Sequence, residues 1–125
     1  MTTILTPNAP QPIGPYSQAI REGDLLFCSG QIPLDPKTGA MKNSSVEEEA
    51  EQALINLGEV LRAGGSNISG VIKTTIFLTD MNDFAKVNEV YASAFGDAKP
   101  ARSTVAVSAL PKGARVEIEC IARVL

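Results

Sequence analysis

The sequence predicts an α+β fold, in which a mixed β-sheet carries two helices on one face. Two segments show the apolar repeat of an amphipathic helix, and the segments around them are rich in β-branched residues. Each helix connects two strands, as a right-handed crossover does. The expected order along the chain is a β-hairpin, a helix, a strand, a second helix and two final strands.

The first elements are a loop and a hairpin. Residues 7–16 contain four prolines and predict an ordered, extended loop, because proline fixes φ and removes a backbone donor. Residues 18–20 and 25–31 predict two strands on either side of a turn at 21–24. Gly30, in the second strand, indicates a bulge or a close approach of another group to the backbone.

The first helix is predicted by its ends as well as by its repeat. Ser45 and Glu48 have the spacing of a capping box, and Gly64 and Gly65 permit a left-handed cap at the other end. One stripe of apolar residues recurs between them at helical spacing: Val46, Ala50, Ala53, Leu54, Leu57 and Leu61.

The second half of the chain predicts a strand over 71–79, a helix over 82–95, and strands over 103–109 and 115–125. Two right-handed crossovers can place both helices on the same face of the sheet. The other face is then left uncovered, and we expect a second copy of the chain to bury it. The residues expected there are small, β-branched or apolar: Thr75, Phe77, Thr79, Thr104, Ala106 and Ser108.

Composition restricts the chemistry that is available. The 125 residues fit one domain spanning 1–125, without a signal peptide or a membrane span, so we expect a cytoplasmic protein. The net charge of -3 argues against broad nucleic-acid binding but allows a pocket for a small anion. The chain has no histidine, which excludes Ser-His-Asp and Cys-His triads and the common zinc sites. Nucleotide-binding glycine motifs are also absent, so no metal and no cofactor is expected. Cys28 and Cys120 are expected to be buried free thiols.

Arg102 and two glutamates form the first candidate site. Arg102 follows Pro100 at the start of a strand, where its guanidinium can present two parallel donors to a carboxylate. Glu117 and Glu119 alternate onto one face of the last strand. If a hairpin joins the last two strands, Arg102 falls close to both glutamates. The alternatives are an exposed arginine at a strand edge and a plain cross-strand ion pair.

Three other polar residues are weak signals taken alone. Tyr16 fits a loop aromatic packed on the core. Ser29 lacks the frame of a nucleophile elbow and fits a strand-end hydroxyl bonded to the backbone. Asn88 lies one helical turn from Phe84 and about one turn from Tyr91, and fits a helix-flank amide bonded to a loop.

Several segments taken together resemble the Rid family of the YjgF type, closest to its reactive intermediate deaminase A branch. The resemblance covers nearly the whole chain. Its most specific parts are Pro100-Ala-Arg-Ser-Thr104 and Val116-Glu-Ile-Glu119. The segments are Ile13-Gly-Pro-Tyr-Ser-Gln18, Cys28-Ser-Gly-Gln-Ile-Pro33, Asn82-Asp-Phe-Ala-Lys-Val-Asn88, Pro100-Ala-Arg-Ser-Thr104, Leu110-Pro-Lys112 and Val116-Glu-Ile-Glu119.

The resemblance implies a chorismate-mutase-like fold and a homotrimer with sites in the clefts between subunits. It implies hydrolysis of 2-iminobutanoate and 2-iminopropanoate to 2-oxo acids and ammonia. The family arginine that holds the substrate carboxylate matches Arg102, and the family's site glutamate matches Glu117 rather than Glu119.

The resemblance also assigns roles to the weaker signals. The residues that line the family's cleft match Tyr16, Ser29 and Asn88. Thr104 departs from the pattern, because many members have cysteine at that position. The group implicated in carboxylate binding there is the backbone amide, which threonine retains. The departure therefore puts cysteine-based redox regulation in doubt, but it does not put activity in doubt.

Other functions stay open at this point. The same pocket could bind a 2-oxo acid or another small carboxylate as a regulatory signal, without chemistry. RNA cleavage or inhibition of translation is also ascribed to the family, but the acidic charge, the 5% aromatic content and the missing histidine oppose it. A second activity as a chaperone is left open by the sequence.

Overall fold

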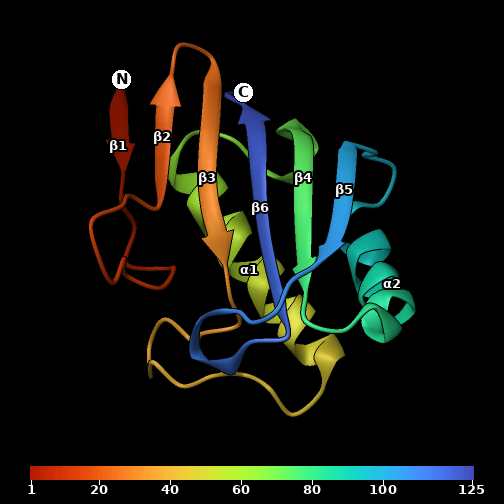
Figure 1. Ribbon diagram of the computed structural model, residues 1–125. Coiled ribbons are helices and arrows are strands. Elements are labelled where there is room, and N and C mark those ends of the chain that lie inside the picture. The colour runs from red at the N-terminus through yellow and green to blue at the C-terminus, as the bar shows by residue number, and fades with distance from the viewer.

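Six strands form one mixed sheet in the order β1-β2-β3-β6-β4-β5 (Figure 1). The computed structural model describes residues 1–125. β4 and β5 pair in parallel, and the other neighbours pair antiparallel. The strands are β1 (Thr2–Ile4), β2 (Ala19–Glu22), β3 (Leu25–Gln31), β4 (Val71–Leu78), β5 (Ala101–Ala106) and β6 (Val116–Arg123).

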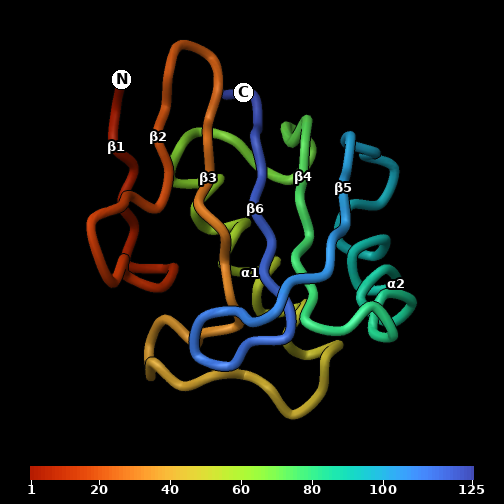
Figure 2. The backbone as a smooth tube through the Cα atoms, in the orientation of Figure 1, coloured from red at the N-terminus to blue at the C-terminus, as the bar shows by residue number.

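Two helices cover one face of this sheet, α1 (Val46–Ala63) and α2 (Phe84–Phe95) (Figure 1). Three short 3-10 turns complete the chain: η1 (Ile68–Gly70), η2 (Met81–Asp83) and η3 (Pro111–Gly113). Both chain ends lie at one end of the sheet (Figure 2). The predicted mixed α+β fold, with both helices on one face, is confirmed. No helix combines the length and the apolar run needed to cross a membrane.

The start of α1 is capped as predicted, with one difference. The hydroxyl of Ser45 accepts the backbone N–H of Glu48 at 3.0 Å. The Glu48 carboxylate accepts hydrogen bonds from Ser44 instead of Ser45. The donors are the backbone N–H and the hydroxyl of Ser44, each at 2.9 Å. The predicted apolar stripe of α1 is buried throughout, and the helix ends before Gly65, whose φ is +85°. Burial of one amphipathic face therefore holds this helix on the sheet.

The predicted hairpin between the last two strands is wrong. β4 lies between β5 and β6, and residues 107–115 connect two strands that are not neighbours. The physical reason is the crossover through α2, which delivers β5 as a parallel strand on the outer edge of β4. The second helix also begins later than predicted, because residues 81–83 form the 3-10 turn η2.

The register shows which residues lie on the uncovered face. Thr104 pairs with Ile76, which is buried under the helices, so Thr104 and Ala106 lie on the helix side and their predicted position is wrong. Thr75 and Phe77 lie on the uncovered face, as predicted. Thr79 and Ser108 lie outside the strands.

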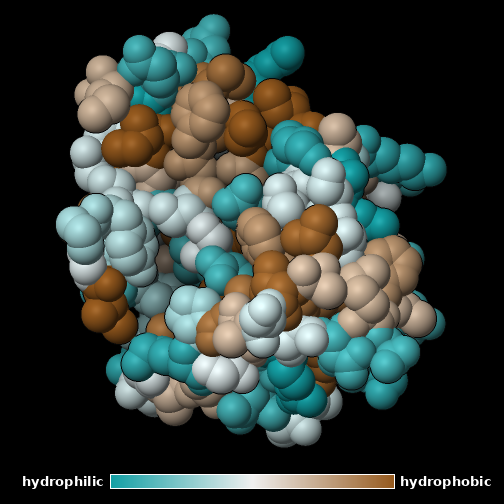
Figure 3. Space-filling view, viewed as in Figure 1, coloured by the Kyte–Doolittle hydropathy of each residue, from teal (hydrophilic) through white to brown (hydrophobic).

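The uncovered face is partly apolar. Figure 3 views it directly and shows hydrophobic residues over the upper parts of β2, β3 and β6. Phe27 is 45% exposed there and Val105 42%. The apolar residues on this face are Ile20, Leu25, Phe27, Phe77, Val105 and Ile121. A face of this composition favours contact with another protein surface.

Candidate functional site

Arg102 lies on edge strand β5, and its side chain extends toward α2. Its Nη1 donates a hydrogen bond to Oδ1 of Asn88 at 2.8 Å. Its guanidinium carbon is 4.9 Å from the centre of the Tyr91 ring and 5.6 Å from that of Phe84. No carboxylate lies within ion-pair distance of it. The guanidinium is thus oriented by α2, and its remaining N–H donors are free to bind an anion.

The support for Arg102 comes from three residues of α2 that lie on one side of the helix. Phe84, Asn88 and Tyr91 follow the i, i+4, i+7 spacing. The Tyr91 hydroxyl is hydrogen-bonded to the buried hydroxyl of Thr74 at 2.7 Å, and the Tyr91 ring stacks on Phe95 at 4.2 Å. Burial raises the pKa of Tyr91, so the ring beneath the guanidinium stays neutral at physiological pH. These contacts fix the ring before any ligand binds.

A cavity of about 410 Å³ lies beside this cluster. Lys99 and Pro100 line it together with Asn88, Tyr91 and Arg102. Two cationic side chains and an amide therefore face a space with aromatic walls. Such a space suits a small organic anion.

Glu117 lies on β6 and is half-buried on the uncovered side of the sheet. Its carboxyl group packs against Gly30, where an added Cβ would lie 2.8 Å from the carboxyl carbon. Gly30 belongs to a bulge between Cys28 and Gln31 in the β3–β6 ladder. Both predictions for Gly30, the bulge and the close approach, are confirmed. No larger residue than glycine leaves this space for the carboxylate.

The environment of Glu117 changes its acidity. Partial burial raises the pKa of Glu117, and the negative charge of Glu119 raises it further. A carboxyl group with a raised pKa accepts a proton more readily near neutral pH than an exposed one. It is therefore suited to general acid–base work.

Tyr16 and Ser29 lie in the same region as Glu117. The Ser29 hydroxyl donates to the carbonyl of Ser17 at 2.6 Å, which is the backbone-bonded arrangement anticipated as the alternative to a site role. Tyr16 is 54% exposed, and its hydroxyl accepts the N–H of Ile13 at 3.3 Å. Tyr16 and Gly30 line a cavity of about 280 Å³ that also includes Pro111 and Lys112 of η3.

The six predicted site residues thus fall into two groups in one chain. The first group, on β5 and α2, is Arg102, Asn88 and Thr104, and the second, around the β3 bulge, is Tyr16, Ser29 and Glu117. Thr104 lies two residues after Arg102, and its Oγ1 is buried without a hydrogen-bond partner.

The two groups do not meet within the chain. Arg102 pairs with Thr74, and Thr74 pairs with Cys120 across β4. Glu117 lies three positions before Cys120 on β6, so its side chain is on the opposite face of the sheet. The proximity of Arg102 to Glu117 and Glu119 inferred from a final hairpin is therefore wrong within one chain.

Sequence reasoning missed the groups that hold the site residues in place. Tyr91, Phe84 and Thr74 support Arg102, but the sequence pattern only placed the first two on the predicted helix over 82–95. Glu49 was missed as well. It is 1% exposed, accepts the backbone N–H of Arg115 at 2.7 Å, and forms an ion pair with the Arg115 guanidinium, which ties α1 to the start of β6.

The two cysteines are buried free thiols, as predicted. Cys28 and Cys120 face each other across β3 and β6. The hydrogen bond to Cys28 and burial raise the pKa of the Cys120 thiol, which disfavours the reactive thiolate. No three metal-ligating side chains come together in the chain.

Comparison with known proteins identifies relatives over nearly the full length. The family described as Endoribonuclease L-PSP matches residues 6–124. The 2-iminobutanoate/2-iminopropanoate deaminase of Mus musculus is 52% identical over 119 residues, which are 95% of this chain and 88% of that protein.

Solved structures agree with this result. The Rid-family protein YyfA of Yersinia pestis, whose function is unknown, superposes with a TM-score of 0.96 at 50% identity over 98% of each chain. The TdcF protein of E. coli with bound serine superposes with a TM-score of 0.94 at 42% identity, also over 98% of each chain. The sequence resemblance is therefore confirmed at the level of sequence and of fold, and the chain belongs to the YjgF/Rid family.

Proposed function

We propose that this protein hydrolyses 2-imino acids, 2-iminobutanoate and 2-iminopropanoate among them, to 2-oxo acids and ammonia. The observation that carries the proposal is the guanidinium of Arg102, which is oriented by Asn88 and Tyr91 and has no carboxylate partner in the chain. Relatives that are about half identical in sequence are named for this activity. All 2-imino acids carry the carboxylate that such an arginine recognises.

Arg102 binds the substrate carboxylate in this proposal. Asn88 uses one of the five N–H donors, which leaves enough for two parallel hydrogen bonds to the carboxylate. The backbone amide of Thr104 lies on the same edge strand and supplies a further donor to the anion. Fixing the carboxylate also fixes the adjacent imine carbon, because the two carbons are bonded directly.

Glu117 handles the proton in this proposal. Its carboxylate orients a water molecule whose oxygen adds to the imine carbon, while the imine nitrogen takes up a proton. The C–N bond of the resulting tetrahedral adduct then breaks, ammonia leaves, and the 2-oxo acid remains. Acid–base assistance of this kind is worth about 10²–10⁴ in rate. Imines also hydrolyse without an enzyme, so no larger acceleration is required.

The site is proposed to form between subunits, because Arg102 and Glu117 lie on opposite faces of one sheet. The uncovered face, with Phe27 and Val105 exposed, supports the assembly. In a homotrimer joined through this face, Arg102 of one copy meets Glu117, Tyr16 and Ser29 of the next. The cyclic symmetry then gives equivalent sites at the subunit boundaries.

The direct test replaces Arg102. The imine is generated in the assay from an amino acid by a dehydratase, and ammonia release is compared with the uncatalysed rate. Arg102→Ala is expected to abolish the enzyme-dependent part, and Arg102→Lys to lose most of it, because an ammonium group lacks the planar fork. Arg62→Ala, which removes an exposed arginine of α1, is the matched control and is expected to retain full activity.

Two outcomes would contradict this assignment. Full activity of a folded Arg102→Ala protein removes the arginine from the site. A wild-type protein that binds 2-oxobutanoate through Arg102 but does not accelerate imine hydrolysis is a carboxylate-binding protein without this activity. The circular dichroism spectrum and the melting temperature of each variant show whether it is folded.

A further inference from the structure

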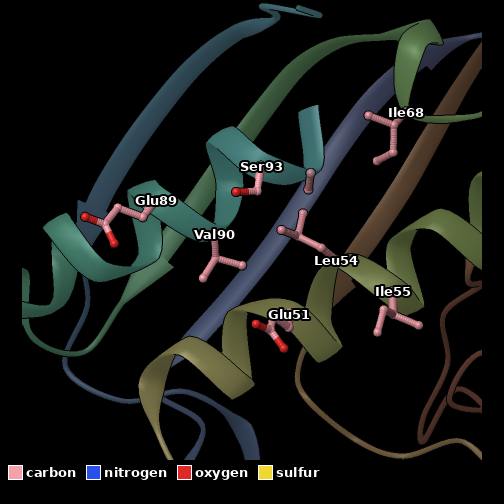
Figure 4. A pocket seen from close by; sticks show the side chains of 8 residues that line it. Glu51, Leu54, Ile55, Ile68, Glu89, Val90 and Ser93 are labelled. Carbon is pink, nitrogen blue, oxygen red and sulfur yellow. The ribbon is translucent and has the colours of Figure 1, made fainter. Parts of the chain in front are cut away.

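The outer surface of the helical layer carries a groove between α1 and α2, lined by none of the residues in the proposed site (Figure 4). Its volume is about 610 Å³. Leu54 and Ile55 of α1 form one wall, and Val90 and Ala94 of α2 form the other. Ile68 of η1 lies at the end near Ile55 (Figure 4). This end of the groove is therefore aliphatic.

The aliphatic end is open to solvent. Ile55 is 57% exposed, whereas its neighbour Leu54 is 6% exposed and belongs to the core. An isolated exposed isoleucine is ordinary, but this one borders a concave surface made of four other apolar residues. Covering it would remove apolar area from water, which favours binding.

The opposite end is acidic. Glu51 extends from α1 and Glu89 from α2, and both are exposed. Glu89 lies at the left of Figure 4 and Glu51 near its lower centre. Neither carboxylate forms an ion pair, and no lysine or arginine lines the groove. Two unpaired negative charges beside an apolar surface favour a partner with an apolar stripe and a positive end.

We propose that this groove binds an amphipathic helix of another protein, with aliphatic residues one turn apart and Lys or Arg beside Glu51 and Glu89. The two walls are themselves helices, so the groove runs between ridges of side chains, as in helix–helix packing. A groove that is open along its top accepts a row of side chains from one face of a helix. The proposal is independent of imine hydrolysis.

The test uses a designed probe. It is a fluorescein-labelled peptide of about 16 residues, long enough to form helix, with leucines at i, i+3, i+4 and i+7 and two lysines at one end. A matched peptide has glutamates in place of the lysines. Fluorescence anisotropy measures binding, and amide shifts in NMR spectra locate it. The lysine peptide is expected to bind with shifts confined to α1, η1 and α2, and more weakly at high salt.

Protein variants separate charge from shape. The double variant Glu51→Gln, Glu89→Gln is expected to bind the lysine peptide about 2- to 30-fold more weakly, as two exposed ion pairs imply. Ile55→Ser is expected to weaken binding of the peptide as well. Glu59→Gln changes a carboxylate of α1 that does not line the groove, and is expected to leave binding unchanged.

Four results would overturn the proposal. The lysine peptide could fail to bind at roughly millimolar concentration, or the glutamate peptide could bind equally well. Amide shifts on the uncovered sheet face would place the peptide elsewhere. Tighter binding of hexylammonium than of the peptide would make the groove a small-molecule site instead. Imine hydrolysis, measured in the same variants, is expected to be unchanged.

Discussion

At the scale of single residues, Glu117 shows how the surroundings give a carboxyl group its chemistry. It lies partly buried against Gly30, with Glu119 on the same face of β6. Burial and the neighbouring charge both oppose ionisation, so both raise the pKa of Glu117. A carboxylate that orients water must be ionised. The rate of enzyme-dependent imine hydrolysis should therefore rise as the pH increases through the pKa of Glu117.

Glu119→Gln tests this residue-scale account. Removing the negative charge takes away one cause of the raised pKa, so Glu117 ionises at a lower pH in the variant. The ascending limb of the kcat/KM–pH profile is expected to move to lower pH, with the same plateau rate. The uncatalysed hydrolysis is subtracted at each pH, and titration of the imine itself is common to both proteins and cancels. An ascending limb that does not move would remove Glu117 as the titrating group.

At the scale of elements, the bulge in β3 and the length of α2 place the site residues. The bulge brings Gly30 beneath the Glu117 carboxyl group, and α2 carries three side chains at the spacing needed to hold Arg102. Neither element contributes chemistry of its own. Each fixes the position of a charged group that would otherwise be mobile.

Gly30→Ala is expected to displace the Glu117 carboxyl group, because the new methyl group would occupy its space. We expect a loss in kcat of about tenfold or more, since a displacement of about 1 Å at a reacting group costs up to 10²-fold. Gly58→Ala in α1 is the matched control. Nothing lies near its added methyl group, and it is expected to stabilise the protein by about 0.5–1 kcal/mol without changing activity. Wild-type kcat in Gly30→Ala would contradict the role given to the bulge.

Two substitutions of Tyr91 separate its ring from its hydroxyl. Tyr91→Phe keeps the ring under Arg102 but leaves the fully buried Thr74 hydroxyl unpaired, so the protein should lose about 1–3 kcal/mol of stability and keep its KM. Tyr91→Leu removes the ring as well, and its KM should rise about two- to fivefold with the lost cation–π contact. Denaturant unfolding and steady-state kinetics measure the two effects. An equal KM in both variants would show that the ring does not position Arg102.

The sequence predicts local structure here better than strand order. The cap at Ser45, the stripe of α1 and the bulge at Gly30 depend on neighbouring residues, and all three are confirmed. The place of β5 depends on a crossover of some twenty residues, and local patterns favoured a simple hairpin instead. That error put Arg102 beside Glu117 and Glu119. The Arg102–Tyr91–Thr74 cluster was missed for the same reason, since it joins three elements.

At the scale of the whole molecule, the positions of the two residue groups make assembly the main question. One chain holds Arg102 and Asn88 near α2, and Glu117 near the β3 bulge on the other face of the sheet. A single chain so arranged cannot bind one small substrate with both groups. The proposed activity therefore requires that a second copy complete each site.

Subunit mixing tests this claim most directly. Arg102→Ala and Glu117→Gln proteins, each inactive alone, are unfolded together, refolded as an equal mixture and assayed for enzyme-dependent ammonia release. In a trimer with shared sites, roughly one-quarter of the sites receive an intact Arg102 and an intact Glu117 from neighbouring copies, so about a quarter of the wild-type activity should return. Mass spectrometry of the intact assemblies verifies that mixed trimers form. Mixed trimers without recovered activity, or a protein that stays monomeric and active, would contradict a site shared between subunits.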